Sequence, residues 1–315
     1  MDRKPQDEPG KSSDEPKMNA SDDVTDCRPL AGPDATAFGP GLVGDTSPSA
    51  ARRYFSLLAA ASPGHRLEMV SRLSRMVRAA ALLGARQREP NLPKDQLRQR
   101  VAEFMYGRIE ARFGLERNWG KTMANDDGFD AFGVALAVGE ALDSLGIAYF
   151  VGGSLASSFQ GEPRATNDID VVVELRESQI APLAQKLGPD FSVDEEGLKA
   201  AVRARRSDNI FFLPMVTKVD IFVCGRAPFD LSEMARRRRL EVQPGRHLWI
   251  KSAEDTVLRK LLWYRQGGEV SNSQWRDITS VLRISGGSMD SAYLGEWAPV
   301  LRVEDLLARA RAEIA

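Results

Sequence analysis

Two glycines, a serine and two aspartates have the types and the spacing to do chemistry in this chain. Gly152 and Gly153 follow a short apolar segment and precede Ser154, where a helix can begin. Glycines permit a tight turn there, and the free N–H groups at the start of a helix bind phosphate. Asp168 and Asp170 follow on a predicted strand, and because residues i and i+2 of a strand point to one face, their carboxylates project together. Paired carboxylates that leave room for water and phosphate are ligands for Mg²⁺.

A third carboxylate and an arginine belong to the same constellation. Asp220 lies in the apolar strand Lys218–Cys224. If that strand pairs beside the Asp168 strand, three carboxylates converge, which supports two metal ions about 3.5–4 Å apart that clamp the oxygens of phosphoryl transfer. The predicted ions are Mg²⁺, with Mn²⁺ as the alternative. Arg164 precedes the aspartates, where it could position the loop or contact phosphate.

Alternating strands and helices must position these residues. A mixed order of elements that ends in a run of helices indicates an α+β fold, in which a mixed β-sheet with flanking helices carries a helical C-terminal subdomain. We therefore predict one domain at 129–315, with a catalytic core at 129–250 and a helical part at 251–315. The predicted strands are 148–151, 168–175, 209–213 and 218–224, and the predicted helices of the core are 129–145, 177–187 and 195–206.

The residues before this domain form three segments of different composition. Residues 1–50 hold 7 of the 17 prolines, and their 10 acidic and 5 basic side chains give a net charge of −5, so we predict a disordered tail. Residues 51–115 hold 5 acidic and 13 basic side chains, a net of +8, and are predicted to be a small basic helical module. Residues 116–128 are predicted to be a linker.

Two amphipathic helices are predicted in the basic module. Apolar residues recur at three- and four-residue steps in His65–Gln87, with arginines on the other face. A second helix is predicted to start at Pro93, because proline suits the first turn of a helix. The first helix is predicted to pack through Met69, Val70, Leu73, Val77, Ala80 and Leu83, and to expose Arg66, Arg72, Arg75, Arg78 and Arg86.

Composition excludes several other classes of protein. No apolar run approaches the roughly 18 residues that a membrane span needs, and the charged N-terminus has no apolar signal segment behind it, so we expect a cytoplasmic protein with no membrane partner. The two cysteines, Cys27 and Cys224, lie far apart, and the chain has only two histidines. Disulfide frameworks and Cys/His metal sites are therefore excluded, and catalysis must rest on carboxylates, Lys/Arg and backbone amides.

Three separated motifs in the predicted domain support a family resemblance. Gly152–Ser154, then Asp168 and Asp170, then Asp220 resemble the nucleotidyltransferase fold of the polymerase-β superfamily. More narrowly, Arg164–Asp170 together with Asp255–Lys260 and Arg276–Asp277 is similar to the AbiEii-type nucleotidyltransferases, which are known as toxins of abortive-infection and toxin–antitoxin systems. The resemblance covers residues 129–310, approximately.

The resemblance implies a reaction. A nucleoside monophosphate would pass from an NTP to a hydroxyl acceptor, such as an RNA or tRNA end or a protein, with release of pyrophosphate. Asp220 would bind the metal that activates the acceptor hydroxyl and could take its proton. The implied phosphate- and nucleotide-binding residues are Gly152, Gly153, Ser154, Arg164, Lys260, Arg276 and Asp277, and the implied metal ligands are Asp168, Asp170 and Asp220.

Structural roles remain as alternatives for several of these residues. Lys260 could be a helix lysine that extends to solvent, and Arg276 and Asp277 could form a buried ion pair. The run Arg236–Arg239 is most simply a solvated helix end, or else a nucleic-acid contact. We expect Trp263, Trp275 and Trp297 to be core residues.

A different class of function is also open. The domain could be a catalytically weak binding or regulatory protein that acts with its fused helical module. The +8 of residues 51–115 faces a net −4 in residues 116–315, which hold 29 acidic and 25 basic side chains, so the module could dock on the domain within one chain.

Overall fold

The structure, a computed structural model, describes residues 48–93, 96–97, 100–101, 131–166, 168–215 and 217–314. The predicted linker and almost all of the predicted tail lie outside these ranges. Residues 48–50 were assigned to the tail, but they begin helix α1 (Pro48–Ala60), because proline is favourable in the first turn of a helix. Across the described ranges, no helix combines the length and apolar character that crossing a membrane requires.

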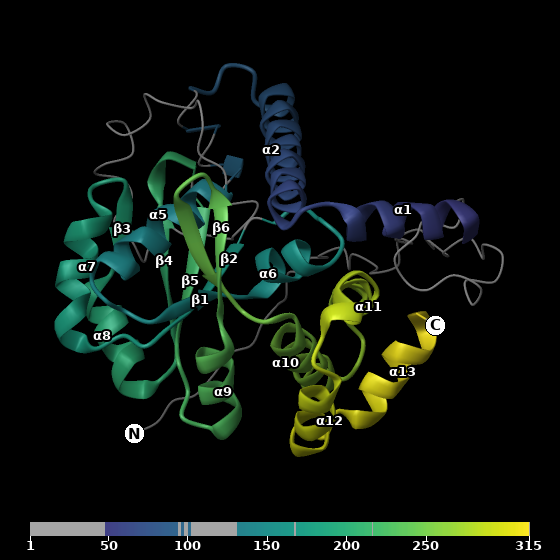
Figure 1. Cartoon of the computed structure of the whole chain (residues 1–315). Coiled ribbons are helices and arrows are strands. Elements are labelled where there is room, and N and C mark those ends of the chain that lie inside the picture. The colour runs from purple at the N-terminus through teal and green to yellow at the C-terminus, as the bar shows by residue number, and fades with distance from the viewer. Residues whose placement is uncertain are drawn as a thin grey trace, which may run out of the picture. The chain divides into compact units, whose positions relative to one another are not determined.

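A mixed sheet forms the core of the fold, as the sequence predicted, but it has seven strands where four were predicted (Figure 1). Its strand order is β3-β4-β5-β2-β1-β7-β6. The β2–β5 and β1–β7 pairs are parallel and the other neighbours are antiparallel. The strands are β1 (Tyr149–Val151), β2 (Asp168–Val173), β3 (Phe191–Val193), β4 (Ser207–Phe212), β5 (Thr217–Val223), β6 (Arg238–Gln243) and β7 (Arg246–Ile250).

The pairing of β2 with β5 confirms the condition on which the predicted carboxylate cluster depended. Burial alternates along both strands, so each has one buried face and one partly open face. The buried face carries Ile169 and Val171 on β2 and Val219 and Ile221 on β5, which are all less than 2% exposed. The opposite face carries the charged residues. Apolar burial therefore sets the register that brings the charged residues side by side.

Helices cover the buried face of the sheet. The helix α5 is almost wholly apolar and buried, and it shares one apolar cluster with α6, α7, α8 and the inner face of the strands. The helix α6 follows directly after β1, so its first turn lies at the end of that strand. The bounds are α5 (Ala131–Ser144), α6 (Gly153–Gln160), α7 (Ile180–Leu187) and α8 (Glu195–Ala204), with short 3₁₀ turns η3 (Glu177–Gln179) and η4 (Leu213–Met215).

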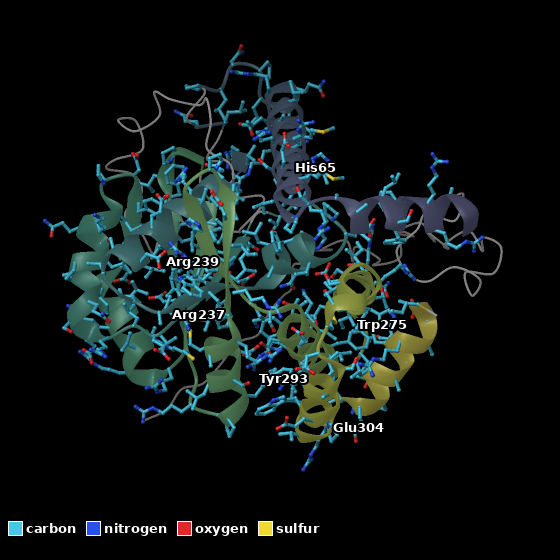
Figure 2. The ribbon with its side chains drawn as sticks, viewed as in Figure 1. His65, Arg237, Arg239, Trp275, Tyr293 and Glu304 are labelled. Atoms are coloured by element: carbon cyan, nitrogen blue, oxygen red, sulfur yellow. The ribbon has the colours of Figure 1, made fainter. Side chains whose placement is uncertain are left out.

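The C-terminal helices form a second apolar core, as predicted. Trp275 and Tyr293 lie within it (Figure 2), and Phe229 of α9 packs against it from the end of the sheet domain. Trp297 is partly buried against the same cluster. The helices are α9 (Pro228–Arg236), α10 (Ala253–Gln266), α11 (Asn272–Ser285), α12 (Ser291–Val300) and α13 (Glu304–Ile314), with the 3₁₀ turn η5 (Gly286–Ser288) between α11 and α12.

Strand β3 and the β6–β7 hairpin were missed, and the solvated helix end predicted at Arg236–Arg239 is correct only for its first residue. The helix α9 ends at Arg236, whose guanidinium lies 3.7 Å from the ring centroid of Tyr293. Arg237 lies over Trp249, and the next two arginines begin β6. Alternation of charged and apolar residues along β6 was hidden by the arginine run, so the strand could not be recognised from composition alone.

Helix α2 (Pro63–Arg88) forms as predicted but packs through a different face. Leu67, Val70, Ser71 and Ser74 are buried, whereas Leu73, Val77, Ala80 and Leu83 are exposed. The predicted apolar face is therefore wrong for those four positions. Ser74 accepts a hydrogen bond from the Thr166 N–H of the loop before β2, and the apolar periodicity of the helix cannot reveal a contact of this kind. Of the second predicted helix, residues 96–97 and 100–101 are described and are helical.

Arg66 was expected on the exposed face of α2 and is instead buried. It donates hydrogen bonds to the carbonyl oxygens of Phe159 at 2.8 Å, Leu58 at 2.8 Å and Ala61 at 2.7 Å. Burial lowers the pKa of its guanidinium. The Arg66 side chain thus joins α1, α2 and the end of α6 through three backbone carbonyl groups.

We expect Arg66→Ala to destabilise the fold by about 2–4 kcal/mol, because it leaves buried carbonyls without donors. Urea unfolding followed by circular dichroism measures the change. Arg72→Ala is the control: Arg72 is exposed and pairs with Glu68 one turn away, a contact worth about 0.3–0.5 kcal/mol. Equal effects of the two substitutions would contradict the structural role of Arg66.

Candidate active site

Three carboxylates and a lysine form a compact group on the open face of β2 and β5. In the register of the two strands, Asp168 lies opposite Lys218 and Asp170 lies opposite Asp220. The Lys218 Nζ atom is 2.9 Å from Asp220 Oδ2 and 4.0 Å from Asp168 Oδ1. The predicted convergence of the aspartates therefore has a cation inside it that the sequence did not suggest.

Two of these carboxyl groups hold their protons more tightly than usual. Burial raises the pKa of Asp170, and the neighbouring charges of Asp220 and Asp168 raise it further, which outweighs the opposing effect of Lys260 and Lys218. Burial also raises the pKa of Asp168, although the charges of Lys218 and Arg78 oppose it. Crowded carboxylates of this kind favour binding of additional positive charge.

The turn between β1 and α6 fits closely around Asp170. The Gly152 N–H donates to the Asp170 carbonyl oxygen at 2.9 Å. Gly153 has φ +55°, and a Cβ atom built on it would lie 1.7 Å from Asp170 Oδ2. Only glycine fits this position, because the turn needs a left-handed backbone and the carboxylate occupies the space of a side chain. The first turn of α6 is thereby held directly against a predicted metal ligand.

We expect Gly153→Ala to destabilise the protein more than Gly146→Ala does. Gly146 is a matched control, since it has φ +63° and open space where its Cβ would stand. The left-handed backbone costs about 1–2 kcal/mol in both variants. The overlap with Asp170 adds about 1–3 kcal/mol in Gly153→Ala alone. Urea unfolding measures both, and equal losses would show that the turn can open without cost.

A chain of hydrogen bonds ties the site to helix α2. Ser154 Oγ lies 2.8 Å from Thr166 Oγ1, and Thr166 Oγ1 donates to the Asp168 carbonyl oxygen at 3.0 Å. The Thr166 N–H in turn donates to Ser74 Oγ at 3.0 Å, and Ser74 is 1% exposed. The loop that precedes the aspartates is therefore positioned from both sides. Ser74 was not singled out in the sequence, because a serine on a helix carries no signal of its distant partner.

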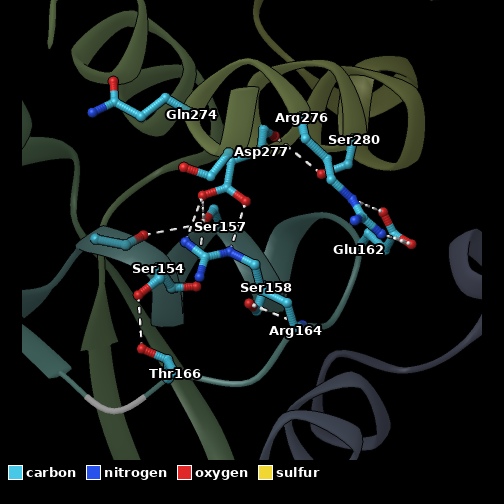
Figure 3. Close-up of polar contacts among 12 residues, drawn as sticks. Ser154, Ser157, Ser158, Glu162, Arg164, Thr166, Gln274, Arg276, Asp277 and Ser280 are labelled. Atoms are coloured by element: carbon cyan, nitrogen blue, oxygen red, sulfur yellow. Dashed lines mark hydrogen bonds and ion pairs between the residues drawn. The ribbon is translucent and has the colours of Figure 1, made fainter. Parts of the chain in front are cut away.

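Asp277 forms a buried ion cluster beside α6 (Figure 3). It accepts two hydrogen bonds from Arg164, from Nε and Nη2 at 3.0 Å each, and one from Lys260 Nζ at 2.8 Å. Ser157 Oγ on α6 donates to the same carboxylate at 3.1 Å. The structure thus brings Arg164, Lys260 and Asp277 together, with two cations for one anion near the first turns of α6.

Arg276 lies apart from this cluster. It donates to both carboxylate oxygens of Glu162 at 2.9 Å and 2.8 Å, and Tyr54 Oη on α1 donates to Glu162 as well. The predicted contact of Arg276 with a nucleotide remains a prediction. Its guanidinium joins α11 to the loop after α6 and to α1.

A cavity of about 160 Å³ opens beside Asp170 and extends toward the ends of β2 and β5. Its far wall is Trp263 of α10, which is 37% exposed, so the expectation that Trp263 is a core residue is wrong. None of the cavity residues that come later in the sequence than Asp220 was predicted as a site residue. The lining residues are Gly152, Gly153, Asp170, Val172, Phe222, Val223, Cys224, Gly225, Asp230, Glu233, Lys251, Arg259 and Trp263.

The carboxylate group suits a hard divalent cation that keeps part of its water. Among the described residues, no three acidic, histidine or cysteine side chains close into a complete metal-binding group. Mg²⁺ at nucleotide sites commonly uses one or two carboxylates together with water and substrate phosphates. Asp168 Oδ1 is buried and has no hydrogen-bond partner in the part of the chain that the structure describes, so it offers a ligand atom of the required kind.

Comparisons with known proteins give structural likenesses only. No protein-family model matches the chain, and no curated protein matches it. It is similar to an antigenic nucleotidyltransferase-like protein from Paracoccidioides brasiliensis, with 19% identity and a TM-score of 0.34 over 56% of this chain and 89% of that one. It is also similar to the antibiotic-resistance factor ANT(2'')-Ia, with 15% identity and a TM-score of 0.34 over 59% of this chain and 97% of that one. What the site can do follows from its own residues and distances.

Proposed function

We propose that the protein is a Mg²⁺-dependent nucleotidyltransferase, with Mn²⁺ as an alternative ion, that moves a nucleoside monophosphate from an NTP to a hydroxyl acceptor. The observation that carries the proposal is the pairing of Asp170 with Asp220 on parallel strands, with Gly153 at the start of α6 directly against Asp170. Carboxylates and a phosphate-binding helix start are thus within reach of one triphosphate.

The residues divide the work of the reaction. Asp168, Asp170 and Asp220 would hold the ion, which supplies charge stabilisation to the phosphoryl oxygens when bound. Backbone N–H groups at Gly153 and Ser154 bind the outer phosphates. Asp220 accepts the proton of the acceptor hydroxyl, whose oxygen bonds to the α-phosphorus as the bond to the bridging oxygen breaks and pyrophosphate leaves.

The ion cluster around Asp277 supports phosphate binding through its net positive charge. Not every residue of the cluster has to contact the phosphate. Arg164 and Lys260 carry two positive charges and Asp277 one negative charge, so the cluster keeps a surplus of +1 beside α6. The Arg164 side chain is 36% exposed, so of the two cations it is the one that phosphate could contact directly. Lys260 is 6% exposed and acts through the field that it adds at Asp170.

An RNA end is the acceptor that we propose, in keeping with an AbiEii-type toxin role in the cytoplasm. Arg72, Arg75 and Arg86 are exposed on α2. Arg78 of the same helix donates to Thr217 Oγ1 at 3.1 Å, and its charge opposes the rise that burial causes in the pKa of Asp168. Exposed arginines on the helix that carries Arg78 suit a polyanionic acceptor.

A label-transfer screen tests this function. The full chain is incubated with each labelled NTP and Mg²⁺, in separate reactions with total RNA and total protein. We expect label to move to RNA from at least one NTP, and to stay free with the Asp168→Ala/Asp170→Ala variant. Transfer that persists in the double variant sinks the assignment of the site, and label on protein instead of RNA sinks the proposed acceptor.

The regulatory alternative has one observation in its favour. The Lys218 ammonium lies 2.9 Å from Asp220 Oδ2, so a cation of the chain itself pairs with this carboxylate. Calorimetry of the full chain with ATP, GTP, CTP and UTP plus Mg²⁺ separates the two functions, since an enzyme must bind at least one of them. Deleting residues 1–115 is a poor test of regulation, because it also removes Ser74 and Arg66, which contact the sheet domain directly.

A further inference from the structure

The cavity beside Asp170 is the strongest feature that the proposed reaction leaves unused. Val172 and Phe222 follow Asp170 and Asp220 by two residues on their strands, so they continue the same face of the sheet beyond the carboxylates. Trp263 closes the cavity from α10. On this face of the sheet, the next residue along each strand after the carboxylates is therefore apolar or aromatic.

The charged residues of the cavity neutralise one another. Lys251 Nζ lies 2.8 Å from Glu233 Oε1. Arg259 Nη2 lies 2.7 Å from Asp230 Oδ1, and the same guanidinium donates to Glu233. Two acids and two bases leave this end of the cavity without net charge. It suits a neutral group, in contrast to the phosphate-binding end beside α6.

Hydrogen-bond donors remain at the edge of this neutral network. The described bonds of Arg259 use Nε and Nη2, so among the described residues its Nη1 group is a donor without an assigned acceptor. Lys251 Nζ lies 5.8 Å from the ring centroid of Trp263 and 5.1 Å from that of Phe150. The Lys251 ammonium thus lies over the indole, so a flat ring beside Trp263 would meet a cationic donor as well as the apolar strand residues that line the cavity.

We propose that this cavity binds the nucleobase of the NTP, stacked on Trp263. Gly152, Gly153 and Asp170 line the cavity and also belong to the proposed phosphate and metal site, so one molecule can occupy both ends. A volume of about 160 Å³ is small beside the roughly 300–1,000 Å³ of pockets for drug-sized ligands, which suits a single ring system. In this arrangement the exposed Trp263 ring stacks on the base, which a tryptophan inside the core could not do. The assignment rests on the proposed function.

Comparing NTPs with a phosphate chain that has no base isolates the contribution of the cavity. Calorimetry of the full chain with Mg²⁺ measures the affinity for ATP, GTP, CTP, UTP and inorganic tripolyphosphate. The variants are Trp263→Ala and Trp263→Phe, with Val300→Ala as the control, since Val300 is an exposed apolar residue of α12 outside the cavity. Circular dichroism checks that each variant is folded.

We expect Trp263→Ala to weaken the best-bound NTP about 5- to 150-fold, which is the value of one base–aromatic stack, and to leave tripolyphosphate binding within twofold. Trp263→Phe should retain most of the NTP affinity, because a ring remains. Val300→Ala should change neither affinity.

Three results would overturn the base site while the proposed function stands. One is NTP binding that is unchanged in Trp263→Ala, and another is wild-type protein that binds NTPs no more tightly than tripolyphosphate. The third is an equal loss of NTP and tripolyphosphate affinity in Trp263→Ala, because it would mean that the phosphate end had been disturbed. If the wild-type protein binds neither NTPs nor tripolyphosphate, the proposed function and the base site both fail.

Discussion

Replacing Asp170 with asparagine is expected to abolish nucleotidyl transfer and, at the same time, to raise the stability of the metal-free fold. Loss of a metal-binding carboxylate removes several kcal/mol of charge stabilisation, which is roughly a 10³-fold loss of rate or more. The stability gain has a separate origin. The pKa of Asp170 is raised by burial and by Asp220 and Asp168, so its ionised form disfavours folding at neutral pH.

The sign of the stability effect follows from proton binding. An acid whose pKa is higher in the folded state binds its proton more tightly there, so folding is favoured as pH falls through that raised pKa. Above it, the charge is destabilising, and the neutral amide of Asp170→Asn removes that charge at every pH. We expect Tm in metal-free buffer at neutral pH to rise by a few degrees.

Differential scanning calorimetry and the label-transfer assay measure the two effects on one preparation. Asp190→Asn is the control, because Asp190 is exposed and lies outside the cluster. Retained transfer in Asp170→Asn would remove this residue from the machinery. A lower Tm would mean that the Asp170 carboxylate stabilises the fold. Its other interactions would then outweigh the repulsion between the crowded carboxylates.

Asp277→Asn is expected to have the largest effect on stability, a loss of about 3–5 kcal/mol. The substitution leaves Arg164 and Lys260 partly buried without an opposite charge, and breaking one partner of a buried pair is strongly destabilising. Burial alone would raise the pKa of Asp277, but hydrogen bonds from Arg164 and the charge of Lys260 outweigh it, and the net pKa is lowered.

The lowered pKa gives Asp277 a pH signature. A carboxyl group with a depressed folded-state pKa stabilises fully above its unfolded value, and that stabilisation is lost as pH falls through the folded-state pKa. The unfolding free energy of the wild-type protein should therefore fall below about pH 4, where unfolded aspartate titrates, more steeply than that of Asp277→Asn. Urea titrations at several pH values compare them.

Glu140→Gln is the matched control for this substitution. It breaks another two-bond carboxylate–arginine pair, with Arg246, but both partners are exposed. A pair of that kind contributes about 0–1 kcal/mol. Similar losses in Glu140→Gln and Asp277→Asn would show that burial does not decide the strength of the Asp277 cluster.

The parts of the site that the sequence predicted share a local cause. Asp168 and Asp170 were found because a strand places i and i+2 on one face, and the glycine turn was found because its residues are consecutive. Asp220 required only that two apolar strands pair, which burial of Ile169 and Val219 enforces. Periodicity carries information of this kind, so the mixed character of the sheet, four of its strands (β1, β2, β4 and β5), α6 and the helical C-terminal part were predicted, whereas β3, β6 and β7 were not.

The parts that were missed depend on partners far away in the chain. Trp263 has the neighbours of a core residue along its helix, and only the tertiary fold leaves its ring facing a cavity. Arg66 looks like any arginine of a basic helix until carbonyl groups from α1 and α6 surround it. Lys218 could be placed on a strand but not between two carboxylates, since its reach depends on strand pairing.

The hydrogen bond from Thr166 to Ser74 spans 92 residues of sequence, and this separation has a consequence for synthesis of the chain. Translation at roughly 5–20 residues per second separates the appearance of the two residues by about 5–20 s. During that interval Leu67 and Val70, which end in one apolar cluster with the sheet, have no sheet to cover them. The nascent protein therefore carries a helix with an uncovered apolar face for seconds, a time in which chaperone binding or misassembly competes with folding.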